Sequence, residues 1–163
     1  NRTSVAVLTG NESTSDLQNL GKDIFQYFGL GCRNVSKVFV PSGYNFEGFL
    51  NELEYYASAL DHHKYRNNYD YNKSIYLVNG EKHLDTGFLL VKESNELVSP
   101  ISVLYYQEYQ NEDELEHLLK EDEEKIQCII GKSDQFIPFG QAQLPKLDDY
   151  ADGVDTMKFL QAL

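Results

Sequence analysis

Residues 4–41, SVAVLTGNESTSDLQNLGKDIFQYFGLGCRNVSKVFVP, decide the fold because they combine two short apolar runs with an amphipathic segment between them. The runs at residues 5–8 and 37–40 have the length of buried strands, and each is followed by turn residues. The segment between them carries apolar residues at helical spacing on one face. These residues are Leu17, Leu20, Ile24 and Phe28. The order predicts a strand–helix–strand unit with parallel strands.

The ends of this helix are marked by particular residues. Ser13 is a favourable N-cap, and Asp16 lies in the first turn, near the positive end of the helix dipole. Gly29 and Gly31 follow the last apolar position. The helix is therefore expected to carry Phe28 on its apolar face and to end at the glycines.

The rest of the chain continues the alternation of strands and helices. Asn45 is expected to cap a helix, and Asn111 forms a capping-box pattern with Glu114 before another. The polar residues 62–72 give no clear pattern, although a helix that ends near Gly80 is compatible with them. Further strands are expected at residues 88–91, 101–106 and 126–130, and a short helix at residues 154–163. Residues 1–163 are thus predicted to form a single three-layer α/β/α domain with a largely parallel sheet.

Composition limits the classes of function. The chain has 163 residues, of which 41% are hydrophobic and 25% charged, as in a folded domain. The formal net charge of −12 disfavours binding to nucleic acid or to an anionic membrane, since both need a cationic surface. The apolar runs are too short for a membrane span. The absence of an initiator Met or signal peptide before Asn1 leads us to expect a fragment of a longer protein.

The two cysteines lie in different contexts, which predicts no disulfide and a cytoplasmic location. Cys32 follows Gly31, and a glycine lets a ligand approach the backbone closely. The following residues, Arg33 and Asn34, offer backbone N–H groups to a developing oxyanion, and the Arg33 charge favours a thiolate. Cys32 is therefore a candidate nucleophile, with an inert buried cysteine or an incidental surface thiol as the alternatives. Cys128, inside an apolar strand, is expected to be a small core residue.

No metal site is expected from the histidines. His62 and His63 are adjacent, and no further ligands with suitable spacing accompany them. His117 falls on a charged helix that is expected to face solvent. The chain also lacks a phosphate-binding glycine signature of the Walker or dinucleotide type, so no nucleotide-binding domain is expected within it.

Three segments resemble the aldehyde dehydrogenase superfamily in the same order. Residues 29–41, with Gly31-Cys32 before a strand, resemble its Gly-Gln-x-Cys and Arg-x-Phe-Val segments. Residues 95–101 resemble its Glu-Glu-Ile-Phe-Gly-Pro-Val motif, with Glu96 at the second glutamate and Val98 in place of the phenylalanine. Residues 138–141, Pro-Phe-Gly-Gln, resemble its Pro-Phe-Gly-Gly segment.

Residues 29–37 (GLGCRNVSK), residues 137–143 (IPFGQAQ) and the ending at residues 149–160 (DYADGVDTMKFL) are similar to the bacterial acyl-CoA reductases related to the fatty-acid reductase of bioluminescence. The resemblance implies reduction of an acyl-CoA to an aldehyde by NADPH (or NADH) through a thioester on Cys32. It implies that Glu96 contacts the cofactor ribose and that Phe139, like Gly31, Arg33 and Asn34, lies near the substrate. The cofactor is expected to bind mainly to a domain upstream of this chain, so the chain alone is expected not to turn over.

Two other functions stay open at this point. One is an ordinary aldehyde dehydrogenase that forms an acid. The other is a non-catalytic interaction or oligomerisation domain that keeps the fold, and a homo-oligomer is compatible with every alternative. The sequence does not specify the acyl chain length or the choice between NADPH and NADH.

Overall fold

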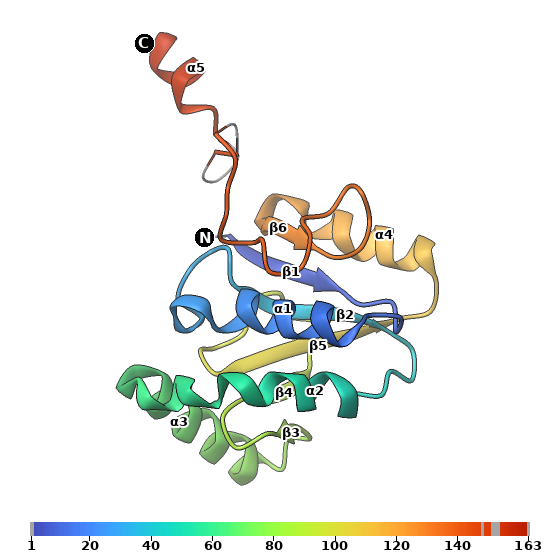
Figure 1. Cartoon of the computed structure of the whole chain (residues 1–163), viewed down its shortest axis with the longest axis vertical. Coiled ribbons are helices and arrows are strands. Elements are labelled where there is room, and N and C mark those ends of the chain that lie inside the picture. The colour runs from blue at the N-terminus through green and yellow to red at the C-terminus, as the bar shows by residue number, and fades with distance from the viewer. Residues whose placement is uncertain (1, 148, 151–153, 163) are drawn as a thin grey trace.

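The computed structural model describes residues 2–147, 149–150 and 154–162. Its centre is a six-stranded sheet with the order β3-β4-β5-β2-β1-β6 (Figure 1). The strands are β1 (Thr3–Val7), β2 (Val35–Pro41), β3 (Leu84–Asp85), β4 (Leu90–Glu93), β5 (Val103–Tyr109) and β6 (Ile126–Ile130). Each neighbouring pair is parallel except β3 and β4, which are antiparallel. The largely parallel sheet that the sequence predicts is therefore confirmed.

The helices lie on both faces of this sheet. The α-helices are α1 (Thr14–Phe25), α2 (Glu47–Leu53), α3 (His63–Asn79), α4 (Glu112–Glu121) and α5 (Thr156–Gln161). Three 3₁₀ segments are η1 (Gln26–Gly29), η2 (Glu54–Asp61) and η3 (Glu123–Lys125). In Figure 1, α1 and α2 cross the sheet on the side that faces the viewer, and α5 projects away from the body of the domain.

Alternating side chains of the strands bury both faces of the sheet. On β1, Ala6 packs in a cluster with residues of α1 and α2, whereas Val5 packs in another cluster with leucines of α4. On β4, Val91 joins the first cluster and Leu90 packs with tyrosines of α3. Since the side chains of a strand alternate between its faces, α1 and α2 cover one face and α3 and α4 the other. This arrangement is the three-layer α/β/α architecture expected from the sequence.

The first helix ends earlier than its apolar spacing predicts. The structure confirms the Ser13 cap as a capping box with Asp16, but α1 ends at Phe25. Tyr27 and Phe28 have φ angles of 54° and 59°, in the left-handed region. The Phe28 ring leaves the helix face and stacks on His62, with 4.0 Å between ring centroids. Predicting Phe28 on that face was wrong because the chain reverses its handedness to enter the loop before β2.

The other helix signals are mostly confirmed. The prediction of Asn45 as the N-cap of α2 was wrong, because Phe46 is the N-cap and makes no side-chain cap hydrogen bond. Asn45 Oδ1 lies one residue earlier and accepts a hydrogen bond of 2.9 Å from the Glu47 N–H. The segment of unclear pattern becomes α3, with His62 as its N-cap and Gly80 in the left-handed conformation at its end. Within the described ranges, no helix has the length and apolar content needed to cross a membrane.

Gly21 brings α1 close to η2, and this contact yields a prediction. A Cβ at Gly21 would lie 2.3 Å from a ring carbon of Tyr56, whereas a Cβ at Gly48 of α2 would meet no atom within 4 Å. We expect Gly21→Ala to lower the free energy of unfolding by about 1–3 kcal/mol through overpacking. Gly48→Ala should raise it by as much as about 1 kcal/mol through helix propensity. Urea denaturation of both variants checks this, and an unchanged Gly21→Ala would contradict the close packing.

Candidate functional site

Cys32 is exposed at a pocket of about 480 Å³. The lining includes Arg2 before β1, residues 31, 32 and 34–36 at the start of β2, Leu89 before β4 and residues 98–103 at the start of β5. Because these strands are parallel, their amino ends lie at the same edge of the sheet. The fold therefore brings together two segments that are more than 60 residues apart in the sequence.

The pocket has an apolar interior and a more exposed mouth. Its buried apolar lining residues are Ile24, Phe25, Val35, Tyr65, Leu89 and Val103, and its buried polar lining residues are Thr3, Asn34 and Ser102. At the mouth, Leu30 and Val98 are 49% and 57% exposed. The Tyr65 hydroxyl donates a 2.9 Å hydrogen bond to the Phe88 carbonyl, and burial raises the pKa of Tyr65. Tyr65 is therefore a neutral wall residue at neutral pH.

Asn34 fixes the turn that carries Cys32. Its Oδ1 accepts a 2.8 Å hydrogen bond from the Gly31 N–H. Its Nδ2 donates to three carbonyls near the end of α1, which belong to Asp23, Ile24 and Gln26, at 3.1, 3.3 and 2.7 Å. The Asn34 side chain is 3% exposed in total, so its amide is used within the protein. It therefore anchors the turn and does not extend into the pocket as a donor.

The backbone of the turn keeps two donors available. The Ser4 hydroxyl donates a 3.0 Å hydrogen bond to the Cys32 carbonyl, which orients that peptide. Among the residues that the structure describes, neither the Cys32 N–H nor the Arg33 N–H has an acceptor. Free N–H groups beside a nucleophile can bind an oxyanion that forms on the attacked carbonyl.

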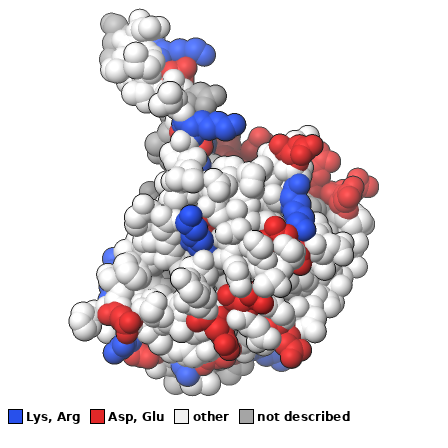
Figure 2. Space-filling view, in the orientation of Figure 1, with Lys and Arg blue, Asp and Glu red and all other residues white. Residues whose placement is uncertain are grey.

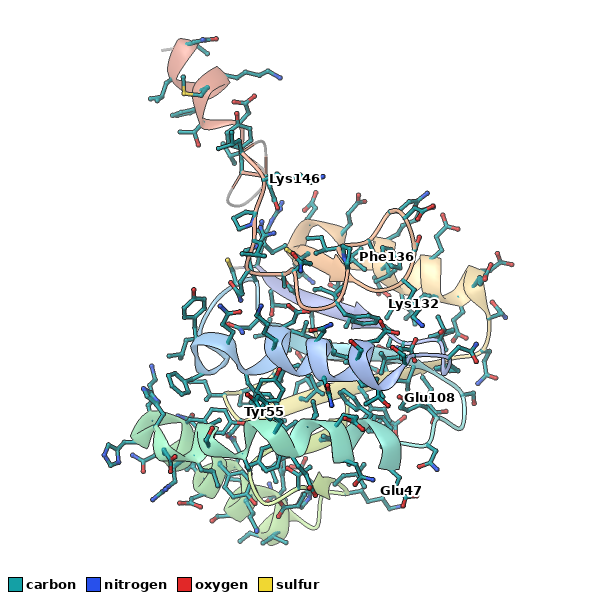
Figure 3. All side chains as sticks on the ribbon, viewed as in Figure 1. Glu47, Tyr55, Glu108, Lys132, Phe136 and Lys146 are labelled. Atoms are coloured by element: carbon teal, nitrogen blue, oxygen red, sulfur yellow. The ribbon has the colours of Figure 1, made fainter. Side chains whose placement is uncertain are left out.

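The Arg33 side chain points to the C-terminal segment. Its guanidinium forms an ion pair of 2.7 Å with Asp149, and its Nε donates to the Ala142 carbonyl. Arg33 is not part of the lining of the Cys32 pocket. Lys146, on the same segment, lies where the chain leaves the body of the domain toward α5 (Figure 3). The residue next to Cys32 thus ties the C-terminal segment to the turn.

Asp23 holds the same segment from the other side. Its fully buried carboxylate accepts hydrogen bonds from the N–H groups of Gly140 and Ala142, at 2.6 and 3.1 Å. Burial raises the pKa of Asp23 to about 6, partly offset by these hydrogen bonds. The same turn places Phe139 in the main core cluster, 7% exposed and outside the lining of the Cys32 pocket.

Glu96 lies at a neighbouring pocket. This second pocket, of about 490 Å³, is lined by residues 95–98, Asp122 and Lys125. Val98 belongs to both linings, so the two pockets share a wall. Of the predicted site residues, the structure thus gathers Gly31, Cys32 and Asn34 at one pocket and Glu96 at the adjoining one.

The other polar candidates have structural partners. Cys128 is buried in the main core cluster, as expected, and burial raises the pKa of its thiol. His62 caps α3 by accepting from the Tyr65 N–H at 3.4 Å. No group of three His, Cys, Asp or Glu side chains suited to a metal occurs within the described part of the chain. On the face drawn in Figure 2, acidic side chains gather over α4, whereas Lys and Arg are scattered.

Sequence reasoning missed Asp23 and the role of the Asn34 side chain. Asp23 offers a signal in retrospect, because it lies three residues after Leu20 and next to Ile24 on the buried side of α1. A carboxylate at such a position needs hydrogen-bond donors from elsewhere in the fold. Nothing in the sequence indicates that residues 140 and 142 would supply them.

The left-handed residues before Cys32 yield a prediction. Tyr27 is 62% exposed and has a φ of 54°, so its side chain contributes little packing while its backbone is strained. We expect Tyr27→Gly to raise the free energy of unfolding by about 0.5–1 kcal/mol, because glycine adopts this conformation without strain. Tyr55→Gly, at an exposed position of η2 without positive φ, should lower it. Urea denaturation measures the free energy of unfolding of both variants. An equal decrease in the two variants would exclude backbone strain at Tyr27.

Asp23 makes the stability depend on pH. Its pKa is about 6 in the folded chain against an ordinary value of 3.8, so the folded state binds the proton more tightly. Its contribution to the free energy of unfolding should therefore fall by about 2 kcal/mol as the pH rises from 4 to 7, and stay constant above that. Asp23→Asn, which does not titrate, should lose this slope. Denaturation of both proteins between pH 4 and 8 measures the difference, and a flat difference would contradict the buried carboxylate.

Comparisons with known proteins identify the fold. No family model and no curated protein matches the sequence. The NAD-dependent aldehyde dehydrogenase of Sinorhizobium meliloti is similar with a TM-score of 0.54, at 10% identity over 86% of this chain and 34% of that chain. The Delta-pyrroline-5-carboxylate dehydrogenase of Mycobacterium tuberculosis is similar with a TM-score of 0.50, at 15% identity over 97% and 33%. The chain spans about a third of each of these enzymes and has the α/β fold found in aldehyde dehydrogenase structures.

Proposed function

We propose that this chain is the cysteine-bearing catalytic part of an acyl-CoA reductase, an oxidoreductase of the aldehyde dehydrogenase type. The observation that carries the proposal is the exposed Cys32 thiol at the mouth of a pocket, on a turn with two free backbone N–H groups. A thiol in this setting can attack a carbonyl carbon while the backbone binds the developing oxyanion.

The described lining of the pocket is compatible with acyl transfer. Arg2 is the one charged residue among the described lining residues, and no carboxylate is among them. A carboxylate beside the thioester would activate water and release the acyl group as an acid. None of the described residues supplies such a group to the pocket, and an acyl-CoA reductase requires that no other part of the protein supplies one.

The acyl-transfer step uses residues of this chain. The Cys32 thiolate attacks the carbonyl carbon of the acyl-CoA thioester, and a bond forms between Sγ and that carbon. The negative charge moves to the carbonyl oxygen, where the N–H groups of Cys32 and Arg33 can bind it. The bond from the carbon to the CoA sulfur then breaks, and CoA leaves as a thiolate that takes up a proton. The product is one thioester in place of another.

The adjoining pocket fits a nicotinamide cofactor. Glu96 presents an exposed carboxylate there, which can accept hydrogen bonds from ribose hydroxyls, and the shared wall residue Val98 places it next to the Cys32 pocket. When bound, a reduced nicotinamide cofactor supplies the hydride that converts the acyl thioester to an aldehyde and frees the Cys32 thiolate. The dinucleotide and the CoA phosphates need cationic or glycine-rich partners that we place in a domain beyond this chain.

The cysteine pair offers a direct test. In the full-length protein without cofactor, an acyl-CoA should acylate Cys32 and release one equivalent of CoA, as measured by mass spectrometry and thiol titration. Cys32→Ala should reduce the rate of CoA release by more than about a thousandfold. Cys128→Ala is the matched control and should keep the acylation, since Cys128 is buried in the core.

Two outcomes would contradict the proposal. If acyl-CoA acylated neither cysteine, the protein would lack the proposed acyl-transfer chemistry, and a non-catalytic interaction domain would be favoured. Acid formation from an aldehyde without CoA, dependent on Cys32, would assign an ordinary aldehyde dehydrogenase instead.

A further inference from the structure

Lys37 is a buried lysine in the middle of the sheet. It lies on β2 and is 1% exposed, and burial lowers the pKa of its ammonium group. A lysine is costly at such a position unless its ammonium has hydrogen-bond acceptors. Neither the pocket around Cys32 nor the acyl-transfer step uses it, so its contacts need a separate explanation.

One contact of Lys37 reaches the loop between β4 and β5, and the other two are with residues of β5 and β2. Its Nζ donates a hydrogen bond of 3.0 Å to the Asn95 carbonyl and one of 2.6 Å to Gln107 Oε1. The same Nζ lies 5.1 Å from the centroid of the Phe39 ring. Within the described residues Lys37 has no carboxylate at ion-pair distance. The ammonium is therefore engaged mainly with a backbone carbonyl and a neutral amide.

Glu96 lies between two residues, Asn95 and Leu97, whose backbone carbonyls accept hydrogen bonds from side chains of β2. Lys37 binds the carbonyl of Asn95, and the neighbouring Ser36 hydroxyl donates a 2.9 Å hydrogen bond to the carbonyl of Leu97. The Lys37 charge also interacts favourably with Glu96, Asp122 and Glu121. Two consecutive residues of β2 thus fix the backbone on both sides of the Glu96 carboxylate.

We propose that Lys37 is a positioning residue that sets the place of Glu96 in the pocket next to that of Cys32. This inference rests on the proposed function and extends it, because it assigns the cofactor side of the site to an anchor on β2. Lys37 touches neither the thiol nor the pocket lining, so it acts on hydride transfer through the loop and leaves acylation of Cys32 alone.

The structural half of the inference is tested on the chain itself by hydrogen exchange. Lys37→Met keeps a long side chain and removes the donor, so the amides of residues 95–99 should exchange about tenfold or more faster. The control Lys125→Met removes an exposed cation of the Glu96 pocket that pairs with Asp122 and should leave these amides unchanged. If Lys37→Met does not fold, Ser36→Ala should show the same direction with a smaller effect. Unchanged exchange at residues 95–99 in the folded variant would overturn the inference.

The functional half uses the full-length protein. Lys37→Met should raise the KM for the nicotinamide cofactor about tenfold to a hundredfold, like Glu96→Gln, while the rate of CoA release on acylation of Cys32 stays that of the wild type. If Lys37→Met lowered the rates of acylation and of reduction equally, Lys37 would have only a structural role. An unchanged KM for the cofactor would show that Lys37 does not position Glu96. Failure of the proposed function appears separately, as a wild-type protein that acyl-CoA does not acylate.

Discussion

The side chain of Asn34 holds the candidate site together. Its side-chain amide accepts a hydrogen bond from the Gly31 N–H and donates hydrogen bonds to three carbonyls at the end of α1. One buried polar group therefore binds both the helix and the turn. The carbonyls at a helix end have no partner within the helix. Asn34 satisfies them and thereby fixes the direction in which the chain leaves α1. The exposure of the thiol depends on that direction.

A second set of contacts joins the C-terminal segment to the same turn. The backbone carbonyl of Asp23 accepts a hydrogen bond from Asn34, and its carboxylate accepts hydrogen bonds from the N–H groups of residues 140 and 142. Arg33 binds the far side of that segment through Asp149. The buried Asp23 carboxylate and the half-buried Arg33–Asp149 ion pair thus couple the C-terminal segment to the turn that carries Cys32, although none of its described residues lines the Cys32 pocket.

The sequence predicts the fold well because strand and helix signals are local. Apolar runs and caps such as Ser13 and Asn111 indicate the elements, and their alternation implies the parallel sheet. The loops that build the site are less predictable. The left-handed backbone at Tyr27 and Phe28 interrupts the helical spacing of their side chains. The position of Phe28 is explained by its stacking on His62 and its packing against the main core cluster.

Some site residues can likewise be recognised from a local motif, whereas others have partners that are distant in the sequence. Gly31 and Cys32 can be singled out from a short motif, whereas Lys37 looks like an ordinary polar interruption of a strand. Its partners Asn95 and Gln107 are 58 and 70 residues away, so they become visible only when the sheet is assembled. The direction of the Arg33 side chain depends likewise on residue 149, far along the chain.

The first strand shows how closely sheet and thiol are connected. The pairing of β1 shifts register next to Ser4 with both of its neighbours, and at this irregularity the Ser4 hydroxyl reaches the Cys32 carbonyl. An extra residue in a strand changes its local twist and redirects side chains. Loss or gain of one residue upstream of Val5 would leave the apolar faces of the rest of β1 intact. It would nevertheless rotate the support of the reactive turn, so a change in length at the beginning of this strand is expected to displace the turn that carries Cys32.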